Sequence, residues 1–260
     1  MRFSNEAEVL DWIRQTGGVW LFLDYDGTLA EFSKNPGIVE QNPAVLQVLD
    51  RLIKTRPDIR IAVISGRRLE DIRKLVPLEG IFLAGAYGIQ VQLPGGDEIL
   101  RDDFHKTRPT LDELKPQWEA LIVNEDGFYL EDKGWSLAIH ARYASEKAAS
   151  EKLLAAKSIA ERISFGNYFR LLGGHRFFEI APAKANKGKT VAYFMEKFPK
   201  QDMRPVYCGD DDKDEEAFSV VHEKKGINVW VLHNKGEIYP SLVDFVIDSP
   251  RNLRIFLNKI

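Results

Sequence analysis

The chain is poor in features that mark secreted and membrane proteins. Its 260 residues include a single cysteine, Cys208, so no internal disulfide can form. No apolar run approaches the roughly 20 residues needed to span a bilayer. The first residues, with Glu6, Glu8 and Asp11, lack the apolar core of a secretory signal. We therefore expect a cytoplasmic protein with no membrane partner.

The chain also lacks a strong charge of either sign. Its 36 basic and 39 acidic residues give a net charge of −3, which argues against a general nucleic-acid-binding protein. Small anionic ligands stay possible, because they need only local positive charge. Hydrophobic residues at 44% and charged residues at 29% are ordinary for a globular protein. The length suits one large domain or two modest ones.

The stretch from Val19 to Leu29 is the most informative one. Five apolar residues, Val19 to Leu23, predict a fully buried strand of a parallel sheet. Asp24 and Asp26 follow at its carboxyl end, where open α/β sheets bind their ligands. Two ionised carboxylates so close together call for a cation, and Mg²⁺ takes oxygen ligands and accompanies phosphates. The alternative is a plain Asp-Gly turn without a ligand.

Buried strands alternate with helices on both sides of a different central pattern. From about Phe104 the order becomes helix, two strands, helix, two strands, which is typical of an α+β module. We therefore predict a catalytic core formed by residues 1–104 and 176–260, interrupted by a cap domain at residues 105–175. Helices are expected at 5–15, 43–54, 69–75, 111–123, 145–162, 187–198 and 251–258, and core strands at 19–23, 59–64, 81–84, 205–208, 227–231 and 244–247.

Three further loops at predicted strand or helix ends carry polar residues. Ser65-Gly66-Arg67 joins a strand to a helix, where a hydroxyl and free N–H groups bind anions, although serine is also an ordinary helix cap. Lys187 begins a helix, the end that disfavours cations, so either a bound phosphate or simple solvation explains it. Residues 210–216 hold six acids, more than a helix dipole needs, which favours a metal ligand among them.

The string Asp24-Tyr25-Asp26-Gly27-Thr28-Leu29 resembles the first motif of the haloacid-dehalogenase-like phosphohydrolases, and the other three loops match the remaining motifs in order. The resemblance implies an α/β fold, with a Rossmann-like core around a parallel sheet and an inserted α+β cap of the C2 type. It implies that Asp24 is the nucleophile and Asp26 the acid/base. It further implies that Ser65, Gly66 and Lys187 bind phosphate, and that Mg²⁺ is held by Asp24, Asp26, Asp210 and Asp211, with Asp214 as a possible support.

More specific segments are similar to those of trehalose-6-phosphate phosphatases. They are Ile64-Ser65-Gly66-Arg67, Glu131-Asp132-Lys133 with Ser136, His140 and Arg142, Lys187-Gly188, and the stretch from Tyr207 to Phe218. The resemblance implies a phosphoric monoester hydrolase of trehalose biosynthesis that acts on a small sugar phosphate. We expect the protein to be a monomer. The residues expected to contact that substrate are Arg67, Tyr87, Glu131, Lys133, His140, Arg142, Glu179 and Asn186.

The sequence departs from that family where sugar contacts are expected. Tyr87 and Gln90 stand where the family usually has histidine and glutamate, and Ala181-Pro182 replaces an Arg-Pro pair after Glu179. The substrate could therefore be another glycosyl phosphate, such as a glucosylglycerol phosphate or a glycosyl-3-phosphoglycerate. A third alternative is a non-catalytic subunit that binds a sugar phosphate, although such a subunit needs no nucleophile. The segment from Glu131 to Lys133 could also be a plain charged hairpin turn.

Overall fold

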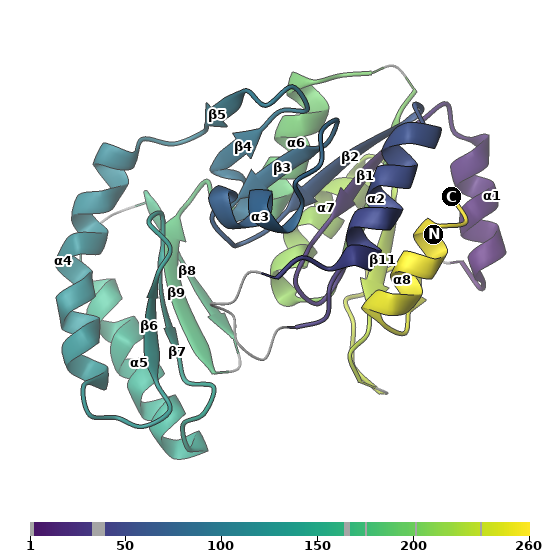
Figure 1. Ribbon diagram of the computed structural model, residues 1–260. Coiled ribbons are helices and arrows are strands. Elements are labelled where there is room, and N and C mark those ends of the chain that lie inside the picture. Colours follow the sequence, from purple (N-terminus) through teal and green to yellow (C-terminus); the bar gives the residue numbers. More distant parts are fainter. Residues whose placement is uncertain (1–2, 33–39, 164–166, 175, 201, 235) are drawn as a thin grey trace. The chain divides into compact units, whose positions relative to one another are not determined.

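The computed structural model describes the chain except for residues 1–2, 33–39, 164–166, 175, 201 and 235. The chain divides into two compact units. The larger combines Met1–Ile99 with Asn186–Ile260, and the smaller is the continuous segment Leu100–Ala185. Figure 1 shows the helices and strands of both units.

A mostly parallel sheet forms the middle of the larger unit. Its strand order is β12-β11-β10-β1-β2-β3-β4-β5. The strands from β12 to β3 pair in parallel, and β4 pairs antiparallel with β3. The strands span Val19–Leu23 (β1), Ile59–Ile64 (β2), Phe82–Gly85 (β3), Gln90–Gln92 (β4), Glu98–Leu100 (β5), Arg204–Gly209 (β10), Ile227–Val231 (β11) and Phe245–Ile247 (β12).

Strand β1 is buried on both faces, as its unbroken apolar sequence predicts. Leu21 and Leu23 belong to the apolar cluster beneath one set of helices, whereas Trp20 and Phe22 belong to the cluster beneath the other set. The helices around the first cluster are α1 (Glu6–Gln15), α2 (Pro43–Thr55), α3 (Leu69–Leu75) and α8 (Pro250–Leu257). Those around the second are α6 (Lys187–Lys197) and α7 (Glu215–Glu223).

The smaller unit packs two helices on one face of a four-stranded antiparallel sheet of order β6-β7-β9-β8. Leu137, Ile139, Phe178 and Ile180 point to the helices. Because side chains alternate along a strand, their neighbours Ala138, His140, Phe177 and Glu179 lie on the opposite face. The elements are α4 (Phe104–Ile122), β6 (Tyr129–Asp132), β7 (Leu137–His140), α5 (Glu146–Arg162), β8 (Phe169–Gly174) and β9 (Phe177–Pro182).

The structure differs from the predictions at two places in the smaller unit. Helix α4 begins at Phe104 rather than at residue 111, with Asp103 as its N-cap, and it contains both Pro109 and Pro116. The core is predicted to resume at residue 176, but strand β9 pairs with β7 as well as with β8 and so belongs to the smaller unit. The smaller unit therefore begins a few residues earlier and ends later than the predicted 105–175. Glu179 consequently belongs to it and not to the core.

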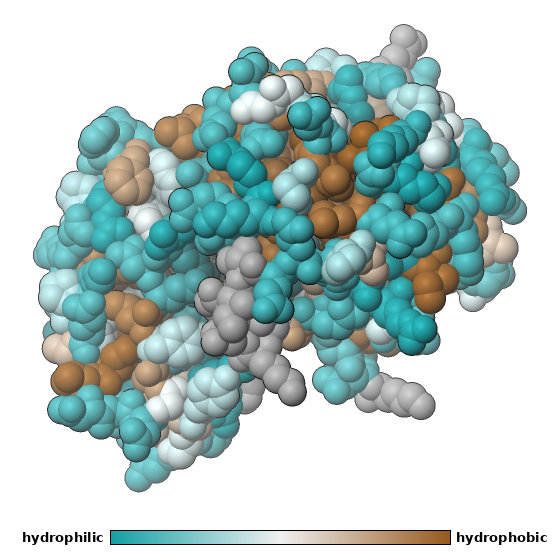
Figure 2. All heavy atoms as spheres, viewed as in Figure 1, coloured by the Kyte–Doolittle hydropathy of each residue, from teal (hydrophilic) through white to brown (hydrophobic). Residues whose placement is uncertain are grey.

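Hydrophilic residues cover much of the face seen in Figure 2, with hydrophobic ones showing between them. Among the residues that the structure describes, no helix is both long enough and apolar enough to cross a membrane.

Candidate active site

The carboxyl ends of the parallel strands gather the predicted catalytic loops on one edge of the larger unit. Asp24 follows β1, Ser65 follows β2 and Asp210 follows β10. These three strands are neighbours in the sheet, with β1 in the middle. The backbone N–H of Asp24 donates to the carbonyl of Cys208 on β10 (3.0 Å), which fixes the first loop to the last one. Two segments that lie far apart in the sequence are therefore joined by a backbone hydrogen bond at this edge.

Lys187 lies at the centre of this edge. It is the first residue of α6, its side chain is 4% exposed, and Asn186 is the N-cap of the helix. Its Nζ atom donates to Asp24 Oδ1 (2.8 Å) and to Asp214 Oδ1 (2.7 Å). Burial acts to lower the pKa of the ammonium, but Asp214 and Asp24 raise it well above its ordinary value. The lysine at the unfavourable end of a helix is therefore explained by buried carboxylates.

Asp214 is fully occupied by hydrogen bonds from the protein. Its Oδ1 accepts from Lys187 and from the hydroxyl of Tyr207 (2.6 Å). Its Oδ2 accepts from the backbone N–H groups of Asp210 (3.0 Å) and Asp211 (3.1 Å). A carboxylate has about four acceptor sites, so Asp214 has no capacity left for another ligand. It positions Lys187 and the acidic loop.

Asp24, Asp210 and Asp214 are all buried, and each offers an oxygen within 4.8 Å of the others. Burial raises the pKa of Asp24 well above its ordinary value; Lys187 opposes this, while Asp214, Asp210 and Asp211 add to it. One ammonium cannot compensate three carboxylates in a low-dielectric site. The cluster is therefore deficient in positive charge. Because Asp214 has no acceptor site left, the oxygens of Asp24 and Asp210 are the ones suited to a hard divalent cation.

Asp210 approaches the first loop so closely that only glycine fits at position 27. Gly27 has a φ angle of 87°, and a Cβ atom there would lie 2.3 Å from Asp210 Oδ2. The hydroxyl of Thr28 donates to Asp210 Oδ1 (2.6 Å). Gly27 and Thr28, which follow Asp26 in the first motif, therefore accommodate and bind the acidic loop, although that loop lies more than 180 positions further along the chain.

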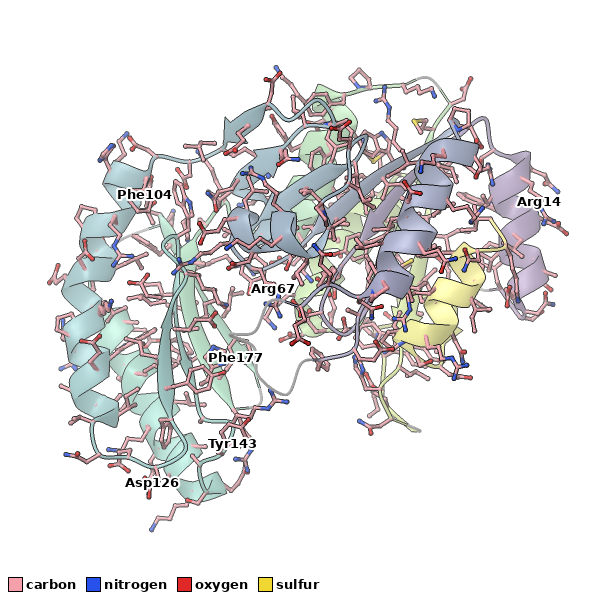
Figure 3. The ribbon with its side chains drawn as sticks, in the orientation of Figure 1. Arg14, Arg67, Phe104, Asp126, Tyr143 and Phe177 are labelled. Atoms are coloured by element: carbon pink, nitrogen blue, oxygen red, sulfur yellow. The ribbon has the colours of Figure 1, made fainter. Side chains whose placement is uncertain are left out.

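Arg67 holds Asp26 through both carboxylate oxygens. Its Nε donates to Oδ2 (2.6 Å) and its Nη2 donates to Oδ1 (2.7 Å), so the two side chains form a bidentate pair. Figure 3 labels Arg67, which follows β2. Ser65 is buried, and its Oγ accepts from the N–H of Arg67 (3.1 Å). The predicted phosphate loop thus contacts the predicted acid/base.

The remaining candidates of the larger unit have structural contacts. Tyr87 is buried with a φ angle of 55°, and its ring fills the space where Gly66 lacks a side chain. Asn186 Oδ1 accepts from the N–H of Lys189 (2.7 Å) as a helix cap. Asp211 Oδ2 accepts a hydrogen bond from Lys213 Nζ (2.8 Å). Burial acts to raise the pKa of Asp211, but the charges of Lys187 and Lys213 outweigh it and lower that pKa to about 2. Substrate contacts by Tyr87 and Asn186 stay predictions.

The smaller unit has a separate polar cluster on the sheet face opposite α4 and α5. His140 Nε2 lies 2.8 Å from Glu131 Oε2. Lys133 Nζ donates to Glu179 Oε2 (3.1 Å), and Ser136 Oγ donates to Glu179 Oε1 (2.6 Å). Four of the five predicted sugar-contacting residues of this unit therefore lie together. Glu131 and Asp132 are the last residues of β6, and Lys133 begins the turn to β7. The charges of Glu131 and Lys133 face partners on β7 and β9.

Arg142, the fifth, is exposed beyond the end of β7. Its charge acts on the Tyr129 hydroxyl on β6. Burial raises the pKa of that hydroxyl, the charge of Glu131 raises it further, and the charge of Arg142 lowers it. The rings of Tyr129 and His140 stack with centroids 4.5 Å apart. Phe177, labelled in Figure 3, lies on β9 opposite His140.

Two contacts of the catalytic edge had no signal in the sequence. His233 Nε2 lies 2.8 Å from Asp210 Oδ2, although His233 belongs to no predicted motif. Lys213 donates to Asp211 and Asp212 within the acidic loop (2.8 and 3.1 Å). Asp210 and Asp214 are the buried acids of that loop, and since Asp214 is saturated by its four donors, Asp210 is the buried one that keeps acceptor sites for a ligand.

The fold and this carboxylate-rich edge define the class of protein as haloacid-dehalogenase-like. The model of the Trehalose-phosphatase family matches residues 22–246, and the chain belongs to that family. The trehalose-phosphate phosphatases of Mycobacterium tuberculosis and Mycobacterium avium are 29% and 28% identical to it over 92% of its length. The chain spans about 60% of the length of these relatives.

Solved structures agree on the fold. The C-terminal domain of Candida albicans trehalose-6-phosphate phosphatase has a TM-score of 0.84 at 17% identity, covering 98% of this chain and 96% of that one. The C-terminal domain of the Candida albicans trehalose synthase regulatory protein has a TM-score of 0.81 at 14% identity, covering 99% of both chains. A catalytic and a regulatory protein thus share this fold, so the site residues must decide the activity.

The surplus of buried carboxylates predicts a stabilising effect of Mg²⁺ that depends on pH. Asp24 has a raised pKa in the folded state, so its contribution to stability is greatest below its unfolded pKa and is lost as the pH rises. A cation needs the ionised form, so its affinity rises with pH. We expect a fixed Mg²⁺ concentration, set at about 100 times the Kd found at about pH 8, to raise Tm by about 5–10 °C at that pH.

Thermal unfolding at about pH 6 and about pH 8, with Mg²⁺ or with EDTA, measures this effect. The gain in Tm is expected to be larger at the higher pH. Equal gains at both pH values, or no gain at either, would contradict the assignment of the buried carboxylates as ligands.

Proposed function

We propose that the chain is a Mg²⁺-dependent phosphatase that hydrolyses trehalose 6-phosphate to trehalose and phosphate. The observation that carries the proposal is the buried contact of Lys187 with Asp24 (2.8 Å), since a binding protein has no need of a nucleophile held by an ammonium group. The relatives named trehalose-phosphate phosphatase support the choice of substrate. We expect the enzyme to be cytoplasmic and monomeric, and size-exclusion chromatography tests the latter.

In the first step, an Asp24 carboxylate oxygen attacks phosphorus while the bond from phosphorus to the sugar oxygen breaks. Asp26 gives its proton to the departing sugar oxygen. In the second step, Asp26 takes a proton from water, whose oxygen attacks phosphorus. The bond from phosphorus to Asp24 breaks, so phosphate leaves and both aspartates return to their starting forms. Lys187 and Ser65, with the backbone of Gly66, bind the phosphoryl oxygens.

Arg67 could bind both Asp26 and the phosphoryl group of a substrate. It donates one hydrogen bond to each oxygen of Asp26, which leaves each oxygen one further acceptor site for a proton. The phosphoryl oxygens of a substrate offer the guanidinium an alternative bidentate partner. This second partner gives a physical reason for the predicted contact of Arg67 with the substrate.

The carboxylates of Asp24 and Asp210 and the backbone carbonyl of Asp26 would hold Mg²⁺, with Asp211 in support. The cation supplies charge that offsets the repulsion between the Asp24 carboxylate and the phosphate. Asp214 orients Lys187 instead, because its oxygens have no capacity left.

The smaller unit acts as the cap domain that selects the sugar. Its residues Glu131, Lys133, His140, Arg142 and Glu179 offer charged donors and acceptors for sugar hydroxyls. The buried Glu179, held by Lys133 and Ser136, keeps Lys133 in place at the edge of the sheet.

Phosphate release from a panel of sugar phosphates, with Mg²⁺ and with EDTA, tests the proposal. Trehalose 6-phosphate should have the highest kcat/KM, and EDTA should abolish release. A preference for a glucosylglycerol phosphate or a glycosyl-3-phosphoglycerate would select that alternative, which the changed residues Tyr87 and Gln90 favour. No release from any member would support a non-catalytic binding subunit.

A charge-removing change in the smaller unit should separate sugar binding from chemistry. Glu131→Gln weakens charged hydrogen bonds, so we expect KM for trehalose 6-phosphate to rise about 10–100-fold. Hydrolysis of p-nitrophenyl phosphate, which has no sugar, should stay unchanged. Asp126→Asn is the matched control, because Asp126 is exposed in the same unit (Figure 3). Equal losses on both substrates would show that Glu131 serves the fold and not the sugar.

A further inference from the structure

The loop after β11 reaches the catalytic edge through one side chain. His233 is the second residue beyond β11, and its Nε2 atom lies 2.8 Å from Asp210 Oδ2. An ionised carboxylate only accepts hydrogen bonds, so Nε2 is the donor. His233 lies outside all four catalytic loops, and the reaction described above gives it no part.

The two oxygens of Asp210 are held from opposite ends of the chain. Thr28 donates to Oδ1 (2.6 Å) and His233 donates to Oδ2 (2.8 Å). Each oxygen keeps one further acceptor site, since a carboxylate has about four. The two donors therefore fix the plane of the carboxylate and leave it able to bind a cation.

The His233 side chain is itself fixed. Its ring lies against that of Phe32, with centroids 4.8 Å apart, and its backbone N–H donates to Glu237 Oε2 (3.0 Å). Glu237 Oε1 accepts from the Trp230 indole on β11 (3.3 Å). These contacts hold His233 and Glu237 against β11 and fix the position of the imidazole next to Asp210.

We propose that His233 is a positioning residue that orients Asp210 for the divalent cation. The proposal rests on the proposed function, in that this cation is the one the phosphatase reaction uses. Hydrogen bonds to a metal-binding carboxylate fix its direction, and their removal typically weakens metal binding about 10–100-fold. The hydrogen bond from Nε2, rather than the packing of the ring, carries the effect.

Two substitutions separate these contributions. His233→Gln keeps an N–H donor at the same number of bonds from the backbone and loses the ring. His233→Phe keeps a ring against Phe32 and loses the donor. His222→Gln and His222→Phe are the matched controls, since His222 is exposed at the end of α7 in the same unit.

Calorimetric titration of each EDTA-stripped full-length variant with Mg²⁺ measures the effect without any substrate. We expect His233→Phe to raise Kd about 10-fold or more, and His233→Gln and both controls to stay within about threefold of wild type. Normal binding by His233→Phe, or equal weakening by both His233 variants, would overturn the proposal.

Different results would refute the proposed phosphatase function and the proposed role of His233. If wild type binds Mg²⁺ and releases no phosphate from any sugar phosphate, the proposed function fails. The role of His233 is still decided by the titrations. If the phosphatase activity is present and His233→Phe binds Mg²⁺ as wild type does, only the role of His233 is refuted.

Discussion

Replacing Asp24 with asparagine is expected to stop phosphate release while the protein stays folded. Asparagine has the same shape but cannot attack phosphorus, so we expect kcat on trehalose 6-phosphate to fall by about 10⁴-fold or more. The fold should survive, because burial already disfavours the charged form of Asp24. Steady-state phosphate release and circular dichroism measure the two effects.

Asp212→Asn is the control for this change. Asp212 lies in the acidic loop, is exposed and pairs with Lys213 (3.1 Å), so it should keep near-normal activity. An Asp24→Asn protein with near-normal turnover would show that another residue is the nucleophile.

Lys187→Met is expected to damage both stability and activity. The change leaves Asp24 and Asp214 buried without their shared cation, and removing one partner of a buried pair costs about 3–5 kcal/mol. That corresponds to a fall in Tm of about 6–20 °C. The loss of a phosphate-binding charge should lower kcat by about 10³-fold. Thermal unfolding in EDTA and steady-state kinetics test the two parts.

A double-mutant cycle shows whether the stability loss comes from uncompensated charge. Adding Asp214→Asn to Lys187→Met removes one orphaned carboxylate, so the double variant should be more stable than the sum of the single losses by about 0.5–3 kcal/mol. Lys189→Met, at an exposed position of the same helix, is the control and should cost little. Strict additivity would contradict a charge-based role for Lys187.

The catalytic loops could be predicted because their signals are local. An apolar strand ending in Asp24, or a lysine at a helix start, can be recognised from a few neighbouring residues. The parallel arrangement then places the loops that follow β1, β2 and β10 on one edge. In the structure Lys187 contacts Asp24 (2.8 Å), although 163 positions separate them.

Other features depend on contacts that no local pattern encodes. His233 reaches Asp210 from a loop without a motif. Asp214 looked like one acid among six, and only its four donors show that it is saturated. Glu179 was placed in the core because the core was predicted to resume at residue 176. The pairing of β9 with β7, which is a long-range contact, decided otherwise.

In the proposed mechanism the Asp24 carboxylate is the one protein group that forms a bond with phosphorus. Mixing the protein with trehalose 6-phosphate and Mg²⁺, quenching within one turnover and reducing with borohydride would convert an aspartyl-phosphate to homoserine. Mass spectrometry of the peptides then locates the change. We predict homoserine at position 24, only with substrate, and at no other aspartate. Phosphate release without any modification at position 24 would contradict the account.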